Sequence, residues 1–166
     1  MIRLLTGSTH TGKTLLAQRL LERHGAPYLS IDHLKMGLIR SGMCPLTPES
    51  TDEALTAVLW PVVREIVKTA VENGQSLTVE GCYIPFNWRE DFDASCLPHI
   101  RFLCLVFSEA YIRTRFDTIQ THANAIERRK DDSFCTMELL LAENRRNLEA
   151  CRRRGLPYYL IDGPYA

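Results

Sequence analysis

Short apolar runs alternate along the chain with longer segments in which apolar residues recur at helical spacing. The runs are residues 2–6, 27–31, 77–80, 100–107 and 157–161, each of a length typical of a buried strand. Alternation of short buried strands with helices is the pattern of a parallel sheet covered on both faces. The pattern therefore predicts an α/β fold with five parallel strands.

The intervening segments predict helices over residues 15–23, 33–40, 52–72, 109–127 and 136–154. Ser50 or Thr51 is placed to cap the long third helix, and Asn73-Gly74 is typical of the end of a helix. Pro61 interrupts this helix and predicts a kink after Trp60. A short helical turn is expected at 88–92, and 43–50 is expected to be an exposed loop.

Composition narrows the class of protein. The 166 residues suit a single domain spanning 1–166, with 45% hydrophobic and 24% charged residues. The net charge is zero, which provides no general attraction for nucleic acid or membranes. Six cysteines show no C-x-x-C pair or metal-binding spacing, which favours a reducing, cytoplasmic setting. No signal peptide or membrane span is expected, because a strand begins at Ile2 and no apolar run approaches ~20 residues.

The segment between the first strand and the first helix fits the phosphate-binding pattern G-x-x-x-x-G-K-[ST]. Lys13 would reach the β- and γ-phosphates of a nucleotide, and the Thr14 hydroxyl would ligate Mg²⁺. A chance glycine-rich turn is the alternative, but strand, loop and helix follow in the order that the motif needs. The candidate nucleotide-binding residues are Gly7, Ser8, Thr9, His10, Thr11, Gly12, Lys13 and Thr14. His10 occupies a variable position of the motif and is given no chemistry.

Two acidic residues lie at the carboxyl ends of predicted strands, where ligands bind on parallel sheets: Asp32 directly follows one strand and Glu80 is the last residue of another. Asp32 would accept the proton of a substrate hydroxyl or bind the substrate, and its alternative role is to cap the helix at His33. Glu80 would hold water on Mg²⁺, as a partner of Thr14, or bind a substrate hydroxyl. The alternative for Glu80 is a solvated acid at a strand end.

Phosphoryl transfer also needs positive charge on the transferred group. Arg128 and Arg129 are the first candidates, although a charged run of this kind is often a solvated helix end. Arg113 and Arg115 are the alternatives. Lys35 and Arg40 would line a site for an anionic substrate.

These segments resemble the small P-loop kinases, a group that includes adenylate kinases, shikimate kinases, chloramphenicol phosphotransferases and zeta toxins. Residues 30–35 and 39–42 are similar to the substrate-side helix of adenylate kinases, and Arg129-Lys130-Asp131-Asp132 resembles the R-x-D-D of their lid. The resemblance implies a three-layer fold with strand order 2-3-1-4-5, substrate-side helices at about 33–73 and a lid at about 120–134. It also implies ATP as donor and Mg²⁺.

Two departures from adenylate kinases bear on the acceptor. Their D-G-F-P-R is here Glu80-Gly81-Cys82-Tyr83-Ile84, and Lys35 stands where an arginine is usual. Lysine lacks the bidentate phosphate contact of arginine. The sequence therefore favours a kinase for a small hydroxyl-bearing metabolite or antibiotic-like compound, acting as a monomer or homodimer. The alternatives are a nucleotide or nucleoside kinase and a nucleotide-dependent switch, although no N-K-x-D guanine motif occurs.

Overall fold

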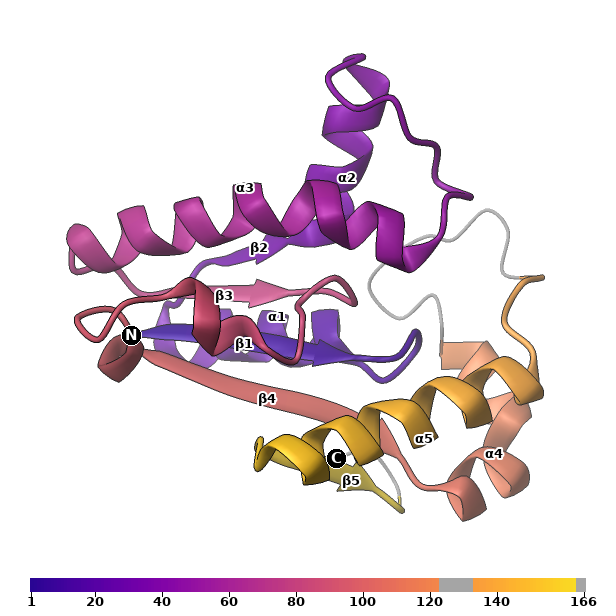
Figure 1. Cartoon of the computed structure of the whole chain (residues 1–166). Coiled ribbons are helices and arrows are strands. Elements are labelled where there is room, and N and C mark those ends of the chain that lie inside the picture. The colour runs from indigo at the N-terminus through magenta and orange to yellow at the C-terminus, as the bar shows by residue number, and fades with distance from the viewer. Residues whose placement is uncertain (123–132, 164–166) are drawn as a thin grey trace.

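A five-stranded parallel sheet forms the centre of the computed structural model, which describes residues 1–122 and 133–163. Its strands are β1 (Ile2–Gly7), β2 (Tyr28–Ser30), β3 (Leu77–Glu80), β4 (Ile100–Phe107) and β5 (Tyr158–Ile161). Their order is β2-β3-β1-β4-β5 (Figure 1), and each neighbouring pair is parallel. The predicted strands and their order are confirmed.

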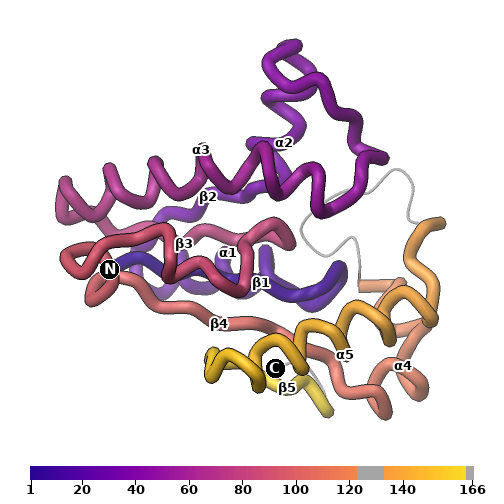
Figure 2. The backbone as a smooth tube through the Cα atoms, in the orientation of Figure 1, coloured from indigo at the N-terminus to yellow at the C-terminus, as the bar shows by residue number. Residues whose placement is uncertain are grey.

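Helices cover both faces of the sheet. They are α1 (Lys13–His24), α2 (Ile31–Arg40), α3 (Asp52–Glu72), α4 (Glu109–Thr121) and α5 (Met137–Arg154), with short 3-10 turns at η1 (Trp88–Asp91) and η2 (Leu97–His99). Figure 2 shows α3 and α5 on the near side of the strands and α1 behind them. None of the helices in residues 1–122 and 133–163 is both long and apolar enough to cross a bilayer.

The strands bury side chains on both faces, which is why they read as unbroken apolar runs. On β1, Leu4 belongs to a core shared with α3, whereas Leu5 belongs to a core shared with α1 and α4. On β4, Val106 and Leu105 divide between the same two cores. The three-layer arrangement follows from this alternation.

The long helix α3 begins and continues for identifiable reasons. The Thr51 hydroxyl accepts a hydrogen bond from the Ala54 amide at 3.2 Å, so Thr51 and not Ser50 is the cap. The helix runs on through Pro61. Pro61 and Ala57, whose carbonyl loses its helical partner, are both exposed, so water can satisfy that carbonyl.

The start of α2 differs from the prediction. The helix begins at Ile31 rather than His33, so Ser30 takes the cap position and Asp32 lies inside the first turn. The interpretation of Asp32 as a helix cap is therefore wrong. Ile31 is fully buried and packs against Gly81, where an added Cβ would lie 2.8 Å from the Ile31 Cβ. The first residue of α2 is therefore part of the core beside β3.

Two other predicted boundaries lie near residues that the structure leaves undescribed. The helix expected to reach 127 is described as α4 to Thr121, and 123–132 lie outside the described residues. Most of the expected lid, 120–134, is in that gap.

Candidate active site

The loop of residues 7–14, here called the phosphate loop, connects β1 to α1 and depends on its glycines. Gly7 has φ +148°, and a Cβ there would lie 2.5 Å from the Leu105 carbonyl oxygen and 2.8 Å from Thr11 Oγ1. Gly12 has φ 80° and sits at the cap position of α1. Both positions exclude ordinary side chains, the first by contact and the second by backbone conformation.

His10 shares the left-handed conformation, with φ 67°, although it is not glycine. Its Nδ1 atom lies 2.8 Å from Thr9 Oγ1. No sequence pattern singled out His10, because the motif leaves this position open. The conformation identifies His10 as the strained point of the loop.

Inside the loop, two donors converge on one carbonyl. Lys13 Nζ donates to the Ser8 carbonyl at 2.7 Å, and Thr11 Oγ1 donates to the same oxygen at 2.9 Å. Lys13 is only 7% exposed. The Lys13 ammonium, which is predicted to bind phosphates, therefore lies within the loop.

Thr14 and Glu80, predicted together as metal partners, are brought together. Thr14 Oγ1 donates to Glu80 Oε1 at 3.3 Å, and Glu80 is 1% exposed. Ser30 is the sheet partner of Glu80, and its buried hydroxyl has no hydrogen-bond partner. Hydroxyl and carboxylate oxygens are the donors that Mg²⁺ prefers, with water completing its shell. Among residues 1–122 and 133–163, no group of three or more histidine, cysteine, aspartate or glutamate residues forms a metal site.

Asp32 and Lys35 form an ion pair one helical turn apart on α2, with Lys35 Nζ 2.7 Å from Asp32 Oδ1. Lys35 also donates to the Tyr83 hydroxyl at 3.1 Å. Burial by itself would lower the pKa of Lys35, but attraction and hydrogen bonding to Asp32 outweigh it and raise that pKa. Burial raises the pKa of Tyr83 to about 12, so its hydroxyl stays neutral. Lys35 was predicted to face an anionic substrate, and here its charge is directed at Asp32.

Cys82 comes two residues after β3, the strand that lies between β1 and β2 in the sheet. Burial raises the pKa of its thiol, the Lys13 ammonium lowers it, and the Asp32 carboxylate raises it further. The carboxyl end of the sheet thus has the phosphate loop after β1 and Asp32 after β2, on either side of β3.

The other candidate cations are spread out. Arg40 is exposed at the end of α2. It lies five residues after Lys35, which is a rotation of about 140° around the helix, so the two side chains do not share a face. Arg113 pairs with Glu109 at 2.8 Å. Arg128 and Arg129 lie outside the described residues. Their predicted role stays a prediction.

A cavity of about 760 Å³ opens beside the phosphate loop, on the side away from α2. Its walls come from the loop, α1, α4 and the segment after β5, and the lining includes His10, Gly12, Arg19, Phe107, Tyr111, Arg115 and Asp162. The Phe107 and Tyr111 rings stack at 5.3 Å, and the Ser108 hydroxyl is hydrogen-bonded to Asp162. The volume suits a small-molecule ligand. Among these lining residues, the sequence had indicated the loop residues and Arg115, an alternative cation; no sequence pattern pointed to the others.

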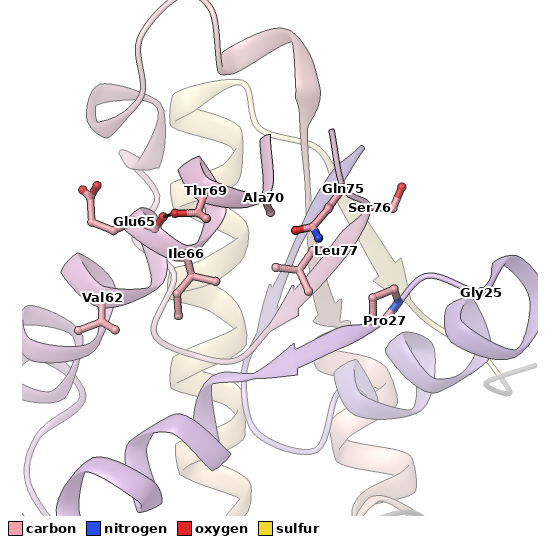
Figure 3. A pocket seen from close by; sticks show the side chains of 10 residues that line it. All are labelled: Gly25, Pro27, Val62, Glu65, Ile66, Thr69, Ala70, Gln75, Ser76 and Leu77. Carbon is pink, nitrogen blue, oxygen red and sulfur yellow. Dashed lines mark hydrogen bonds between the residues drawn. The ribbon is translucent and has the colours of Figure 1, made fainter. Parts of the chain in front are cut away.

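A second cavity of about 720 Å³ lies at the opposite end of the sheet (Figure 3). Its walls are α3 residues such as Ile66, the segments that lead into β2 and β3, including Pro27 and Ser76, and the first residue of β3. These residues lie at or before the first residues of β2 and β3, whereas the phosphate loop, Asp32 and Glu80 lie at or beyond the last residues of β1, β2 and β3. The second cavity is therefore separate from the candidate site.

Comparison with solved structures finds several proteins of similar fold. A shikimate kinase from Bacteroides thetaiotaomicron matches with a TM-score of 0.60 at 10% identity, over 98% of this chain and 85% of its own. A gluconokinase from Sinorhizobium meliloti 1021 matches at 0.55 and 18% identity, over 99% and 83%. A sugar kinase from Janibacter sp. HTCC2649 matches at 0.53 and 18% identity, over 98% and 86%. The fold is that of the small P-loop kinases.

Matches at the level of sequence are absent. No protein-family model matches the chain, and no curated protein matches it. The P-loop kinase fold is thus shown by strand order and superposition. Identities of 10–18% to these three structures show the fold alone.

Proposed function

We propose that the chain is an ATP-dependent phosphotransferase that moves the γ-phosphate of ATP to a hydroxyl of a small molecule. The observation that carries this proposal is the placement of the phosphate loop after β1 and of Asp32 after β2, at the carboxyl end of the sheet on either side of β3. A phosphate-binding cation and a carboxylate on the acceptor side are the two groups that in-line transfer to a hydroxyl requires. The three structural neighbours are named as kinases of small molecules.

In this proposal the cavity beside α4 takes the nucleoside, and residues 7–14 bind the phosphates. The Lys13 ammonium leaves the Ser8 carbonyl, 2.7 Å away, for the β- and γ-phosphate oxygens. Successive backbone N–H groups at the start of α1 add positive potential at the same place. Arg128 or Arg129 adds charge to the transferred group.

Asp32 acts on the acceptor. Its Oδ1 atom is held by Lys35, which leaves Oδ2 to accept the proton of the attacking hydroxyl. Asp32 is 40% exposed and Lys35 is 13% exposed, so the carboxylate faces solvent and the cation lies behind it. This arrangement favours a hydroxyl acceptor over a monophosphate, because Lys35 already has a carboxylate partner. Arg40 is left for a more distant part of the substrate.

The donor set fits Mg²⁺, with Thr14 and Glu80 as the residues that would hold it or its water. When bound, Mg²⁺ neutralises charge that develops on the phosphate oxygens.

The test is a transfer screen with γ-labelled ATP and Mg²⁺ against sugars, sugar acids, nucleosides, nucleoside monophosphates and hydroxyl-bearing antibiotics. Label is expected on a hydroxyl of a non-nucleotide compound, and Lys13→Ala should abolish it. Transfer to a nucleoside or its monophosphate would support a nucleotide or nucleoside kinase instead. Binding of ATP without transfer to any class would favour a nucleotide-dependent switch.

A further inference from the structure

Asn144 on α5 is a buried polar residue that joins three elements of the nucleotide site. It is 2% exposed. Its Nδ2 atom donates to Ser8 Oγ and to the Leu140 carbonyl, each at 2.8 Å. Its Oδ1 atom accepts from the Phe107 amide at 2.8 Å. Three of its four hydrogen-bonding positions are filled, so the amide has one orientation that satisfies its surroundings.

Each partner beyond the helix belongs to a different wall of the site. Ser8 is the second residue of the phosphate loop, and its carbonyl receives the hydrogen bonds from Lys13 and Thr11. Phe107 ends β4, and its ring stacks on Tyr111 in the lining of the neighbouring cavity. Asn144 therefore ties the part that would bind phosphates to the part that would bind the nucleoside.

The residue before Asn144 contacts the same loop. The Glu143 carboxylate accepts a hydrogen bond from the Thr9 backbone amide. Two consecutive residues of α5 thus hold two consecutive residues of the loop, from a helix more than 130 positions away in sequence. Backbone–side-chain contacts of this kind fix a loop that lacks regular hydrogen bonding of its own.

We propose that Asn144 is a positioning residue that sets the conformation of the phosphate loop and its spacing from the nucleoside cavity. It acts through Ser8 and Phe107 and does not touch the nucleotide. The proposal rests on the proposed function for its ligand, ATP, but the restraint on the loop exists without ligand.

The test is a double-mutant cycle read by the Kd for ATP, measured by calorimetry with Mg²⁺. Asn144→Ala and Ser8→Ala should each weaken binding about fivefold, the factor that one net hydrogen bond represents. The double variant should be no weaker than the weaker single variant within about twofold, because both changes remove the same contact. Additive losses would overturn the proposal.

A matched control and a second readout separate positioning from stability. Asn147→Ala, three residues further along α5, should leave the Kd for ATP within about twofold of wild type. Hydrogen exchange without nucleotide should show faster exchange of the amides at 8–12 in Asn144→Ala and not in Asn147→Ala. Unchanged exchange at 8–12 would also overturn the proposal.

Two further outcomes are informative. If Asn144→Ala does not fold, Ser8→Ala still tests the contact, since it leaves the Leu140 and Phe107 bonds of Asn144 in place. Wild-type affinity for ATP in folded Ser8→Ala would then overturn the inference. If wild-type protein does not bind ATP at all, the proposed function fails, and the exchange measurement alone decides the role of Asn144.

Discussion

The Lys35 ammonium lies 2.7 Å from the Asp32 carboxylate, one turn along the same helix, and also donates to the Tyr83 hydroxyl. The proposed base is therefore one member of an ion pair whose cation is mostly buried. Because Asp32 raises the pKa of Lys35, the cation keeps its charge at every pH used for enzyme assays. Its contribution to stability would be lost only as the pH rises through that raised pKa.

Removing the Lys35 charge should impair phosphoryl transfer more than binding of the acceptor. In Lys35→Met, we expect kcat to fall about 10- to 100-fold, the range for a lost hydrogen bond to a charged group. Lys35→Arg keeps the charge and should retain more activity than Lys35→Met. Steady-state kinetics with the acceptor found in the screen measures this. Wild-type kcat in Lys35→Met would show that the pair does not orient the base.

Replacing the proposed base should abolish most turnover without loss of nucleotide binding. In Asp32→Asn, kcat should fall by about 10²- to 10⁴-fold, the usual contribution of general-base catalysis, while the Kd for ATP stays near wild type. Asp117→Asn, on the exposed side of α4, is the matched control and should be fully active. Near-normal turnover of the acceptor by Asp32→Asn would remove Asp32 from the mechanism.

Two glycines should respond oppositely to alanine. Gly7→Ala places a Cβ 2.5 Å from the Leu105 carbonyl oxygen, so we expect the free energy of unfolding to drop by about 2–3 kcal/mol. Gly37 lies inside α2 with open space around it, so Gly37→Ala should raise the free energy of unfolding by about 0.5–1 kcal/mol. Urea unfolding measures both. A stable Gly7→Ala would mean that the loop can move away from β4.

The left-handed backbone at His10 predicts a difference between two truncations. His10→Gly and His10→Ala both lose the contact with Thr9, but only alanine keeps the strain at φ 67°. The glycine variant should be more stable than the alanine variant by about 1 kcal/mol. Thermal unfolding of the two proteins side by side tests it. Equal or higher stability of His10→Ala would place His10 in an ordinary conformation in solution.

The surroundings of Glu143 predict that the free energy of unfolding depends on pH. Burial, and then repulsion from Asp52, raise the pKa of Glu143, while the Thr9 amide, Arg146 and Lys13 lower it less. Because the raised pKa favours protonated Glu143 in the folded protein, its contribution to the free energy of unfolding is fully present below the ordinary pKa of glutamate. That contribution is lost as the pH rises through the pKa of Glu143 in the folded protein. Glu143→Gln should therefore be more stable than wild type at pH 7.

The Glu143→Gln difference should vanish below about pH 4, where the wild-type side chain is protonated in both states. Unfolding free energies measured from pH 4 to 7 supply the comparison. A constant difference over that range would indicate that packing, rather than charge, separates the two proteins. Glutamine can still accept from the Thr9 amide, so the loop contact is kept.

The elements that local pattern specifies were predictable. Apolar runs located all five described strands, and the glycine and lysine spacing located the loop whose Gly7 tolerates no Cβ. The start of α2 was missed because Ile31 was assigned to the preceding apolar run; in the structure it begins the helix and is buried beside Gly81, fifty residues further along the chain. Asn144 carried no sequence signal, since a lone asparagine in a helix reads as an exposed polar residue.

The sequence by itself determined the layer architecture and the phosphate loop, because hydrophobic period and backbone sterics act between residues near one another in the chain. Only the tertiary structure decided that Lys35 pairs with Asp32, that Thr14 donates a hydrogen bond to Glu80, and that Asn144 donates a hydrogen bond to Ser8. These pairings depend on which helix faces and strand ends the parallel sheet brings together. Which helix faces and strand ends come together depends on packing between residues far apart in the chain, and a local sequence pattern does not predict such packing.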